Sequence, residues 1–217
     1  MFKSNKHVNE KIDLYIYGAG GFGREFLSQF NVHNEYKKRF KFISFVDDDL
    51  FIRENCFSLE EVKKVAAQKI VAIVVCIADP AIRKRKVIEL KKENNIIFPS
   101  FVFGKHFSTI RNDCGIICCE NSIVNVDCKL EEFVMLCQGV VVGHDSKVGS
   151  FSTLYPCSFV AGNSVIDKNV QCGANSTIVQ GIRVCSDCFI GAGAVVTKNI
   201  TLPGIYIGVP ARRKNAS

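Results

Sequence analysis

Long hydrophobic runs are absent from this chain of 217 residues, and no stretch approaches the ~20 uncharged apolar residues of a membrane span. The first thirteen residues are polar and lack the apolar core and small-residue cleavage site of a secretory signal. We therefore expect a cytoplasmic protein without membrane contacts. Apolar residues at 47% and charged residues at 23% are ordinary for a globular chain, which excludes disorder and collagen-like repeats.

The net charge of +7 is concentrated in the first half of the chain. Residues 1–105 carry 19 Lys and Arg against 13 Asp and Glu, so six of the seven excess positive charges lie there. These cations are scattered through helical stretches such as residues 83–86, which favours a solvated helix face over a nucleic-acid surface. We expect no nucleic-acid partner, although the excess helps to attract small polyanions such as nucleotides.

Strand and helix patterns alternate from residue 12 to about residue 101. The predicted strands are short apolar runs, at residues 14–17, 42–46, 70–77 and 96–98. The predicted helices lie between them, at residues 24–30, 59–67 and 81–94, and Ser58 with Glu61 predicts a capping box. This alternation indicates a parallel sheet with right-handed crossovers, hence a small Rossmann-like α/β domain over residues 1–103.

The second half has a period of six. Stepping by six from Val124 to Val196 finds an aliphatic residue at every position except Cys172. The position four residues further on holds small or β-branched residues almost throughout. A helix cannot use this period, whereas a solenoid of hexapeptide strands can, with three units closing a triangular coil around stacked aliphatic side chains. We predict an all-β parallel β-helix of hexapeptide repeats over residues 104–217.

Eleven cysteines, an odd number in a chain without a signal sequence, favour reduced thiols over a disulfide framework. The pair Cys185 and Cys188 and the group Cys114, Cys118 and Cys119 have spacings that occur in zinc sites. The period of six argues against zinc, because it places several cysteines on inward positions that need a small apolar residue: Cys118, Cys128, Cys172 and Cys188. It also predicts that Cys185 and Cys188 point in different directions. We therefore expect no metal.

The first predicted strand ends in a glycine-rich loop, Gly18-x-Gly20-x-x-Gly23, that also opens the following helix. A dinucleotide fingerprint requires this context, because glycines permit a tight turn and the free N–H groups of a helix start can face an anion. Asp47 and Asp48 follow the second strand, where they either accept hydrogen bonds from a uracil or guanine base or form a turn. Since the domain is half of a doubly wound fold, we predict that a mononucleotide end of a ligand binds here.

Histidine is scarce, and His144 is the one of four whose neighbourhood suggests chemistry. It lies in Gly143-His144-Asp145, two residues past the inward Val142, so its register points it away from the interior. An imidazole beside a carboxylate is a candidate general base with its orienting group.

These features together resemble the PglD/NeuD-type bacterial sugar acyltransferases, and the resemblance covers nearly the whole chain. It rests on the segments 17–23, 45–48, 77–83, 143–145, 190–198 and 208–211. The resemblance implies a left-handed β-helix and a homotrimer with active sites between neighbouring subunits. It further implies acetyl transfer from acetyl-CoA to the 4-amino group of a nucleotide-linked 4-amino-4,6-dideoxy sugar.

The resemblance also implies roles for individual residues. His144 takes the proton from the sugar amine and Asp145 orients its ring, in a direct transfer without an acyl-enzyme. The nucleotide sugar is held by Gly20, Gly21, Phe22, Asp47, Asp48 and Ala78. Acetyl-CoA lies near Thr153, Gly162, Ala174 and Ala192, with its phosphates toward residues 212–214. Many relatives have His-Pro-Gly where this chain has Tyr155-Pro156-Cys157, and some have a second His at Thr153, so His144 alone supplies the base here.

Three other functions are weighed against this one. An O-acetyltransferase acting on sialic acid or another glycan hydroxyl would use the same base. A trimeric nucleotide-sugar-binding or scaffold protein would bind its ligand without consuming acetyl-CoA. A NAD-dependent oxidoreductase is disfavoured because the sequence contains no second nucleotide-binding half.

Overall fold

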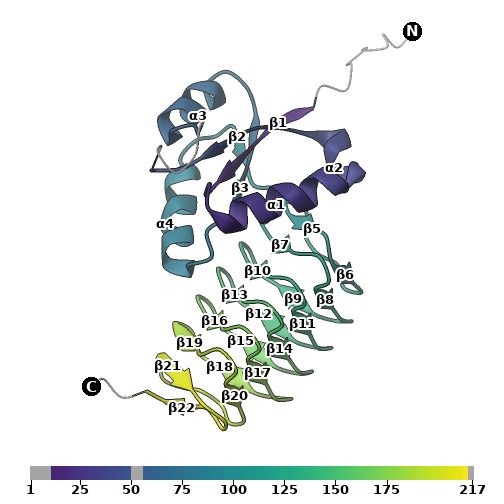
Figure 1. Cartoon of the computed structure of the whole chain (residues 1–217), viewed down its shortest axis with the longest axis vertical. Coiled ribbons are helices and arrows are strands. Elements are labelled where there is room, and N and C mark those ends of the chain that lie inside the picture. Colours follow the sequence, from purple (N-terminus) through teal and green to yellow (C-terminus); the bar gives the residue numbers. More distant parts are fainter. Residues whose placement is uncertain (1–10, 50–55, 215–217) are drawn as a thin grey trace.

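A computed structural model describes residues 11–49 and 56–214 as an α/β domain seated on a left-handed parallel β-helix (Figure 1). The sheet of the α/β domain is parallel and has the order β2-β1-β3-β4. Its strands are β1 (Ile12–Tyr17), β2 (Phe40–Val46), β3 (Val71–Val75) and β4 (Ile96–Ile97). Its helices are α1 (Gly21–Val32), α2 (Asn34–Arg39), α3 (Leu59–Ala66) and α4 (Pro80–Leu90). The predicted parallel sheet is thus confirmed.

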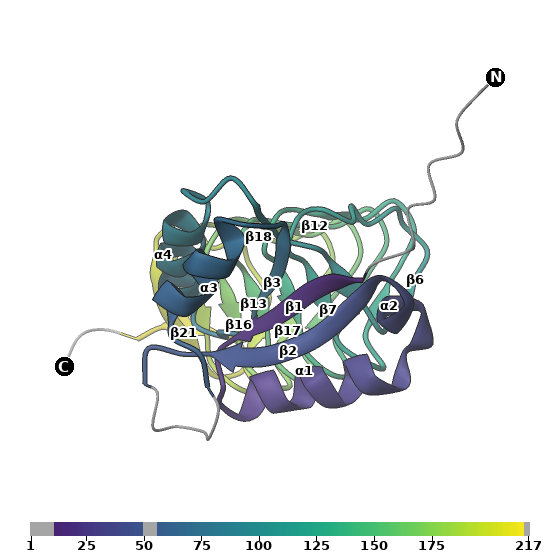
Figure 2. The ribbon, with the colours of Figure 1, turned by 90° about the horizontal axis from the view of Figure 1, so that it is seen from above.

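The helices lie on both sides of this sheet, with α1 on one side and α3 and α4 on the other (Figure 2). Because the chain passes from β1 to β2 and then back across β1 to β3, the order reverses between β1 and β3. Ligands of open α/β sheets bind at the carboxyl ends of the strands beside such a reversal. The loops that follow β1 and β3, near Gly20 and Ala78, therefore lie at the edge of the sheet where a ligand is expected.

Local sequence signals explain the helix starts. Ser58 accepts a hydrogen bond from the Glu61 amide while the Glu61 carboxylate accepts one from the Ser58 amide, which confirms the predicted capping box. Asp79 caps α4 with a single hydrogen bond, which its carboxylate accepts from the Ile82 amide at 2.9 Å. The short helix α2 was not predicted, because it buries none of its residues and has no apolar periodicity.

The β-helix has three faces made of short strands. Face 1 contains β5 (Phe101–Val102), β7 (Ile117–Cys118), β10 (Met135–Leu136), β13 (Thr153–Leu154), β16 (Gln171–Cys172), β19 (Cys188–Ile190), β21 (Gly204–Ile207) and β22 (Arg212–Arg213). Face 2 contains β6 (Lys105–His106), β8 (Ile123–Val124), β11 (Val141–Val142), β14 (Phe159–Val160), β17 (Thr177–Ile178) and β20 (Val195–Val196). Face 3 contains β9 (Lys129–Leu130), β12 (Lys147–Val148), β15 (Val165–Ile166) and β18 (Arg183–Val184).

The interior of the β-helix confirms the predicted inward column. Every sixth residue from Val124 to Val196 is buried except the half-buried Leu130. Residues eighteen positions apart pair in parallel, so Leu154 stacks between Leu136 and Cys172 on face 1. The strand pairing begins with Phe101, a little before residue 104, because β5 pairs with β7.

Each corner between faces contains one residue in the left-handed backbone conformation. These residues recur every six positions from Gly115 to Gly193, with φ between +55° and +73°. Gly, Asn or Asp occupies all of these positions except Phe133, Phe151 and Cys157. This choice is expected, because glycine has no Cβ and the short Asn and Asp side chains tolerate the left-handed region. The corners thereby set the direction in which each following strand leaves.

The cysteine predictions have a mixed outcome. Cys118, Cys128, Cys172 and Cys188 are buried in the β-helix core, as predicted. The expectation that Cys185 and Cys188 point apart is wrong, because the corner after β18 brings their Sγ atoms to 3.6 Å. In the described part of the chain, no group of three or more His, Cys, Asp or Glu side chains is placed to hold a metal ion.

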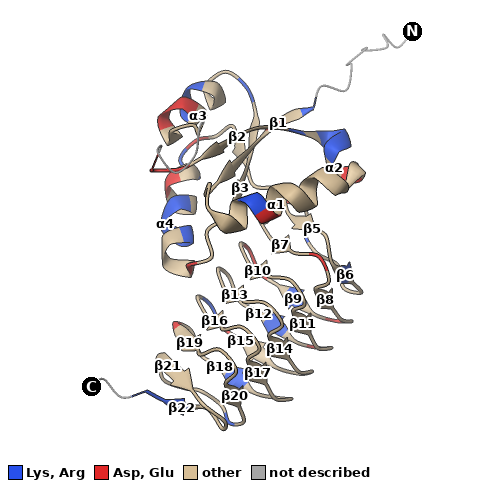
Figure 3. Cartoon of the chain, in the orientation of Figure 1, with Lys and Arg blue, Asp and Glu red and all other residues tan. Residues whose placement is uncertain are grey.

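The surface charges are dispersed. Figure 3 shows Lys and Arg on α2, on α4 and along face 3, with Asp and Glu between them on the helices. None of the helices in residues 11–49 and 56–214 is long and apolar enough to cross a bilayer.

The stacked core of the β-helix predicts the effect of truncating one of its inward side chains. Leu154 is fully buried, so Leu154→Ala leaves a cavity and is expected to lower the free energy of unfolding by roughly 2–5 kcal/mol. Val165→Ala, at an outward position of face 3, is the control and should cost well under half as much. Denaturant unfolding monitored by circular dichroism measures both, and equal losses would contradict the inward assignment.

Glu131 predicts a pH dependence of stability. The hydrogen-bonded ion pair with Lys147 at 2.8 Å and hydrogen bonds from Ser150 lower the pKa of Glu131 to about 2. A carboxyl with a depressed folded pKa stabilises the fold above its unfolded pKa of about 4.3 and loses that effect as the pH falls toward 2. Glu131→Gln should therefore be less stable than wild type at pH 7, and the difference in unfolding free energy should shrink below pH 4.3. A difference that stays constant down to pH 2.5 would contradict this.

Candidate active site

His144 lies on the corner between faces 2 and 3, directly after β11. Its side chain is 52% exposed, which confirms the predicted outward direction. The ring Nδ1 lies 2.7 Å from the Asp145 carboxylate. A carboxylate can only accept a hydrogen bond, so this contact assigns the hydrogen to Nδ1 and leaves Nε2 free to accept a proton from a ligand. The pair has the arrangement of a general base and its orienting group.

The next coil holds the imidazole in place. A Cβ atom on Gly162 would lie 2.5 Å from Nε2 of His144, so glycine at this position leaves the space that the ring fills. The His144 carbonyl accepts a hydrogen bond from the Asn163 amide at 2.8 Å, which fixes the backbone beneath the ring. Asp145 occupies the left-handed position of its corner, with φ of 57°. The structure therefore brings His144, Asp145 and Gly162 together.

The glycine-rich loop contains glycines of two kinds. A Cβ on Gly18 would lie 2.7 Å from the Cys76 carbonyl oxygen, and one on Gly23 would lie 1.9 Å from that of Gly18. These two glycines are needed for folding. In contrast, a Cβ built on Gly20 or Gly21 meets no atom within 4 Å among residues 11–49 and 56–214, apart from its chain neighbours and the backbone of α1. The first turn of α1 thus faces open space, and Gly20 supplies no side-chain cap to its amides.

Asp47 and Asp48 both have partners within the domain. Asp47 accepts a hydrogen bond from the Ala19 amide at 2.8 Å and so shapes the glycine-rich loop. Asp48 accepts from the Tyr17 hydroxyl and pairs with Lys86 at 2.7 Å. The hydrogen bonds from Lys86 and then from Tyr17 lower the pKa of Asp48. The turn interpretation therefore applies to Asp47, while Asp48 is 61% exposed and can still meet a ligand.

Ala78 and Phe22 lie where the α/β domain meets the β-helix. Phe22 is half-buried and packs against the hydrophobic residues of both domains. Ala78 follows β3, and its carbonyl accepts a hydrogen bond from the Thr153 hydroxyl at 2.6 Å. Thr153 is fully buried, so the predicted contact between Thr153 and coenzyme A does not agree with the structure. The reason is that the α/β domain covers this part of face 1.

Ala174 and Ala192 lie on a different corner from His144. Both follow face 1 strands, and the Gly193 amide donates to the Ala174 carbonyl at 2.8 Å, so the two alanines are stacked on adjacent coils. Face 2 separates their corner from the corner of His144. Within one chain the structure therefore does not bring these two alanines together with the imidazole. Arg212 and Arg213 form β22 at the far end of face 1, where both are exposed.

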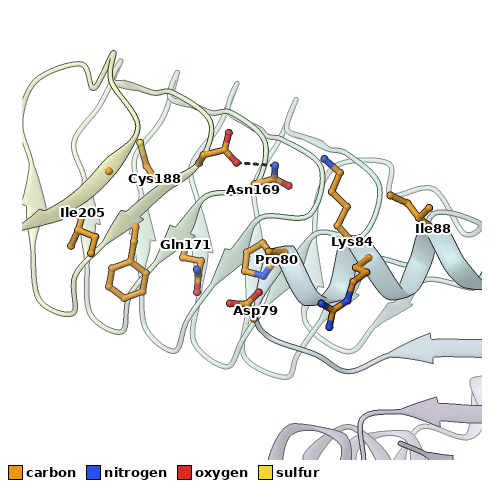
Figure 4. Close-up of a pocket in the computed structure, with 13 residues that line it drawn as sticks. Asp79, Pro80, Lys84, Ile88, Asn169, Gln171, Cys188 and Ile205 are labelled. Atoms are coloured by element: carbon orange, nitrogen blue, oxygen red, sulfur yellow. Dashed lines mark hydrogen bonds between the residues drawn. The ribbon is translucent and has the colours of Figure 1, made fainter. Parts of the chain in front are cut away.

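A cavity of about 610 Å³ lies between α4 and the later coils of face 1 (Figure 4). Lys84 and Ile88 of α4 line one side, while Gln171 and Ile205 of the β-helix line the other. Its lining begins at Asp79, directly after Ala78, and includes neither His144 nor Gly162. This cavity does not enclose the imidazole.

Arg24 is a candidate binding residue that the sequence analysis missed. It lies in the first turn of α1, next to Gly20 and Gly21, and is exposed. Among the described residues it forms no ion pair. A free cation beside an uncapped helix start favours an anionic ligand. The signal was a basic residue directly after the glycine-rich loop.

Sequence comparisons identify the first domain. Residues 13–90 match the family model described as the PglD N-terminal domain. A UDP-3-O-acylglucosamine N-acyltransferase of Bordetella avium is 30% identical over 90 residues, which are 42% of this chain and 23% of that protein. The corresponding protein of a Janthinobacterium species is 29% identical over 90 residues, 42% of this chain and 26% of that protein. The chain therefore aligns with about a quarter of the length of these curated relatives.

Solved structures share the whole fold. PerB from Caulobacter crescentus, solved with CoA and GDP-perosamine, has a TM-score of 0.84 and 20% identity, covering 94% of this chain and 97% of PerB. WeeI from Acinetobacter baumannii has a TM-score of 0.77 and 24% identity, covering 94% of this chain and all of WeeI. The acetyltransferase domain of PglB from Neisseria gonorrhoeae, solved with acetyl coenzyme A, has a TM-score of 0.58 and 18% identity, covering 94% and 100%. These likenesses establish the two-domain architecture.

The contact between Gly162 and His144 predicts the effect of one added methyl group. Gly162→Ala should fold normally, because the obstructing atoms belong to a side chain that can move, but the ring must leave its place beside Asp145. A crystal structure of the variant should show the hydrogen bond between His144 and Asp145 broken. Gln180→Ala, one coil further along the same corner column, should leave that bond intact. An undisturbed ring in Gly162→Ala would contradict the prediction.

Proposed function

We propose that the chain, in which a region matching the PglD N-terminal domain is joined to a left-handed β-helix, is a PglD/NeuD-type sugar acyltransferase and acts as an acetyl-CoA-dependent N-acetyltransferase. The proposed acceptor is the 4-amino group of a nucleotide-linked 4-amino-4,6-dideoxy sugar. The observation that carries the proposal is the exposed His144 ring, held 2.7 Å from Asp145 on a corner of the β-helix.

The proposed reaction is a direct transfer. Nε2 of His144 removes a proton from the sugar amine as the amine nitrogen attacks the thioester carbonyl of acetyl-CoA. A C–N bond forms, the C–S bond breaks, and the leaving thiolate takes up the proton that the imidazole held. Asp145 fixes the ring through Nδ1 throughout. Backbone N–H groups near Gly162 are proposed to stabilise the negatively charged oxygen of the tetrahedral intermediate.

The proposed site for the nucleotide sugar is the crevice between the loops after β1 and β3. Gly20 and Gly21 leave open space at the start of α1, which allows a phosphate to approach the amides. Arg24 adds a cation at the same place, and Asp48 and Ala78 lie on the other loops of this edge. The relatives support a nucleotide sugar, because PerB was solved with GDP-perosamine and other relatives are named for a UDP-linked sugar.

The outer surface of face 2 supports a homotrimer. The first strand, β6, has Lys105 at the outward position, whereas from β8 to β20 the outward residues are uncharged: Ile123, Val141, Phe159, Thr177 and Val195. The outward residues of face 3 are mostly charged: Lys129, Lys147, Val165 and Arg183. An apolar stripe along several coils, with Phe159 40% exposed, favours contact between copies of the chain.

Packing copies through face 2 would also complete the site. His144 lies along one edge of this face, and Ala174 and Ala192 lie along the other. In a closed ring of copies, the His144 edge of one subunit meets the opposite edge of its neighbour. We propose that acetyl-CoA binds in that groove, near Gly162, Ala174 and Ala192, with its phosphates toward Arg212 and Arg213. Acetyl-CoA and reduced thiols both suit the cytoplasm, which is the proposed location.

A substitution at His144 tests the proposal. His144→Ala should lower the rate of acetyl-CoA-dependent thiol release by about 10²–10⁴ with the preferred sugar, because the general base is lost. The assay uses a panel of UDP-, GDP- and dTDP-linked 4-amino sugars, and His106→Ala is the control with unchanged activity.

An unimpaired His144→Ala would remove that residue from the mechanism. The mass and alkali stability of the product separate an amide from an ester. Thiol release with sialic acid or a glycan hydroxyl, and none with the nucleotide amino sugars, would establish the O-acetyltransferase instead.

A further inference from the structure

Arg83 is among the largest fully buried side chains, and it lies where α4 meets the β-helix. Its Nε donates to the Phe133 carbonyl at 3.2 Å, and one terminal nitrogen donates to the Phe151 carbonyl at 2.6 Å. That nitrogen also contacts the Ser152 carbonyl at 3.3 Å and the Thr153 hydroxyl at 2.9 Å. The other terminal nitrogen donates to the carbonyls of residues 77 and 78, at 2.5 and 2.9 Å.

The partners of this guanidinium are all neutral oxygens. Burial lowers the pKa of Arg83 to about 10, so the group remains charged at neutral pH. A buried cation without a carboxylate partner gives little net stability, because its desolvation offsets its hydrogen bonds. Its planar fork, however, joins carbonyls of two domains at fixed angles, which the single nitrogen of a lysine cannot do. The arrangement therefore favours a role in orientation over a role in stability.

We call the contact between α4 and the β-helix around Arg83 the joint. On its β-helix side, two corners hold bulky residues where most other corners hold Gly, Asn or Asp. Phe133 and Phe151 have φ of 56° and 62°, a conformation that bulky residues rarely adopt. Their rings stack at 5.1 Å, and Phe133 also packs against Phe98. Lys91, which directly follows α4 in the α/β domain, lies 5.0 Å from the centre of the Phe133 ring. These two corners carry phenylalanine where they meet the α/β domain, and their carbonyls are directed at Arg83.

On the α/β side of the joint lies the loop after β3, which borders the proposed nucleotide-sugar site. Ala78 follows β3, and its carbonyl receives hydrogen bonds from both Arg83 and Thr153. Arg83 is therefore linked on one side to the loop that contains Ala78 and on the other to corners of the β-helix. A substitution at this guanidinium would alter the contact between the Ala78 loop and the coils while leaving His144 itself unchanged.

We propose that Arg83 is a positioning residue for acetyl transfer, which sets the place of the nucleotide-sugar crevice relative to the coils that hold His144 and acetyl-CoA. This inference rests on the proposed function. If the joint loosens, the sugar amine reaches the thioester in fewer bound complexes, so kcat falls and KM for the nucleotide sugar rises. KM for acetyl-CoA stays the same, because the coils alone hold that substrate.

The test compares Arg83→Lys with Arg39→Lys, an exposed arginine of α2 in the same domain. Initial rates of thiol release are measured with the best sugar of the UDP-, GDP- and dTDP-linked panel, varying each substrate in turn. We expect Arg83→Lys to lose about 10–100-fold in kcat/KM for the nucleotide sugar, as misplaced reactants do, with KM for acetyl-CoA within about twofold. Arg39→Lys should match the wild type. Circular dichroism and size-exclusion chromatography confirm that each variant is folded and assembled.

A second pair of variants keeps the test valid if Arg83→Lys does not fold. Thr153→Val removes the hydroxyl that contacts both Arg83 and Ala78 but keeps the shape of the side chain, whereas Thr153→Ser keeps the hydroxyl. Thr153→Val should lower kcat/KM for the nucleotide sugar by less than Arg83→Lys does, again with KM for acetyl-CoA unchanged. Thr153→Ser should give kinetic values close to those of the wild type.

Two results would overturn the inference and are distinguishable from failure of the proposed function. Unchanged kinetics in the folded Arg83 and Thr153 variants would show that the joint is only structural. A rise in KM for acetyl-CoA equal to that for the sugar would show general loosening. If the wild type and Arg39→Lys release no thiol with any sugar of the panel, the proposed function fails and this inference fails with it.

Discussion

The β-helix depends on a backbone constraint: every sixth residue from position 115 to position 193 takes the left-handed conformation. Glycine, asparagine and aspartate accept this conformation at little cost, so the chain can turn three times per coil and stack its strands in register. Asp145 is one of these residues. The same turn that closes its coil therefore places a carboxylate beside His144 on an exposed corner. The candidate base and its orienting group are a consequence of how the coil turns.

The α/β domain adds what a corner of the β-helix lacks. A flat prism with an exposed imidazole has no enclosure for a nucleotide, whereas open α/β sheets bind ligands beside a reversal of strand order like that between β1 and β3, and here α1 begins without a side-chain cap. The two parts work together only if their relative placement is fixed. The buried Arg83 and the stacked rings of Phe133 and Phe151 provide that placement. We propose that the uncharged outward residues of β8 to β20 on face 2 then form the contact through which a neighbouring copy completes the site.

Features that repeat along the chain, and features that follow from local sequence rules, were predictable from the sequence. The column from Val124 to Val196 was predictable because one packing environment recurs every six residues, and the helix start at Ser58 was predictable because capping is local. Thr153 was misjudged because its burial depends on the α/β domain covering face 1, a tertiary contact without a local signal. The approach of Cys185 to Cys188 depends on the path of a corner that the repeat alone does not specify. Arg24 was missed although its position after the glycine-rich loop was visible.

In the homotrimer that we propose, the active site is shared, with His144 from one subunit acting on a sugar held by the α/β domain of another. This claim is tested most directly by mixing two inactive variants. His144→Ala lacks the base, and Gly20→Leu places a side chain at the proposed sugar site, where an added Cβ meets no described residue within 4 Å apart from its chain neighbours. Refolding or co-expressing the two together should restore thiol release above that of either alone, since some mixed oligomers pair an intact corner with an intact crevice. Mixed oligomers that form but remain inactive would contradict the claim.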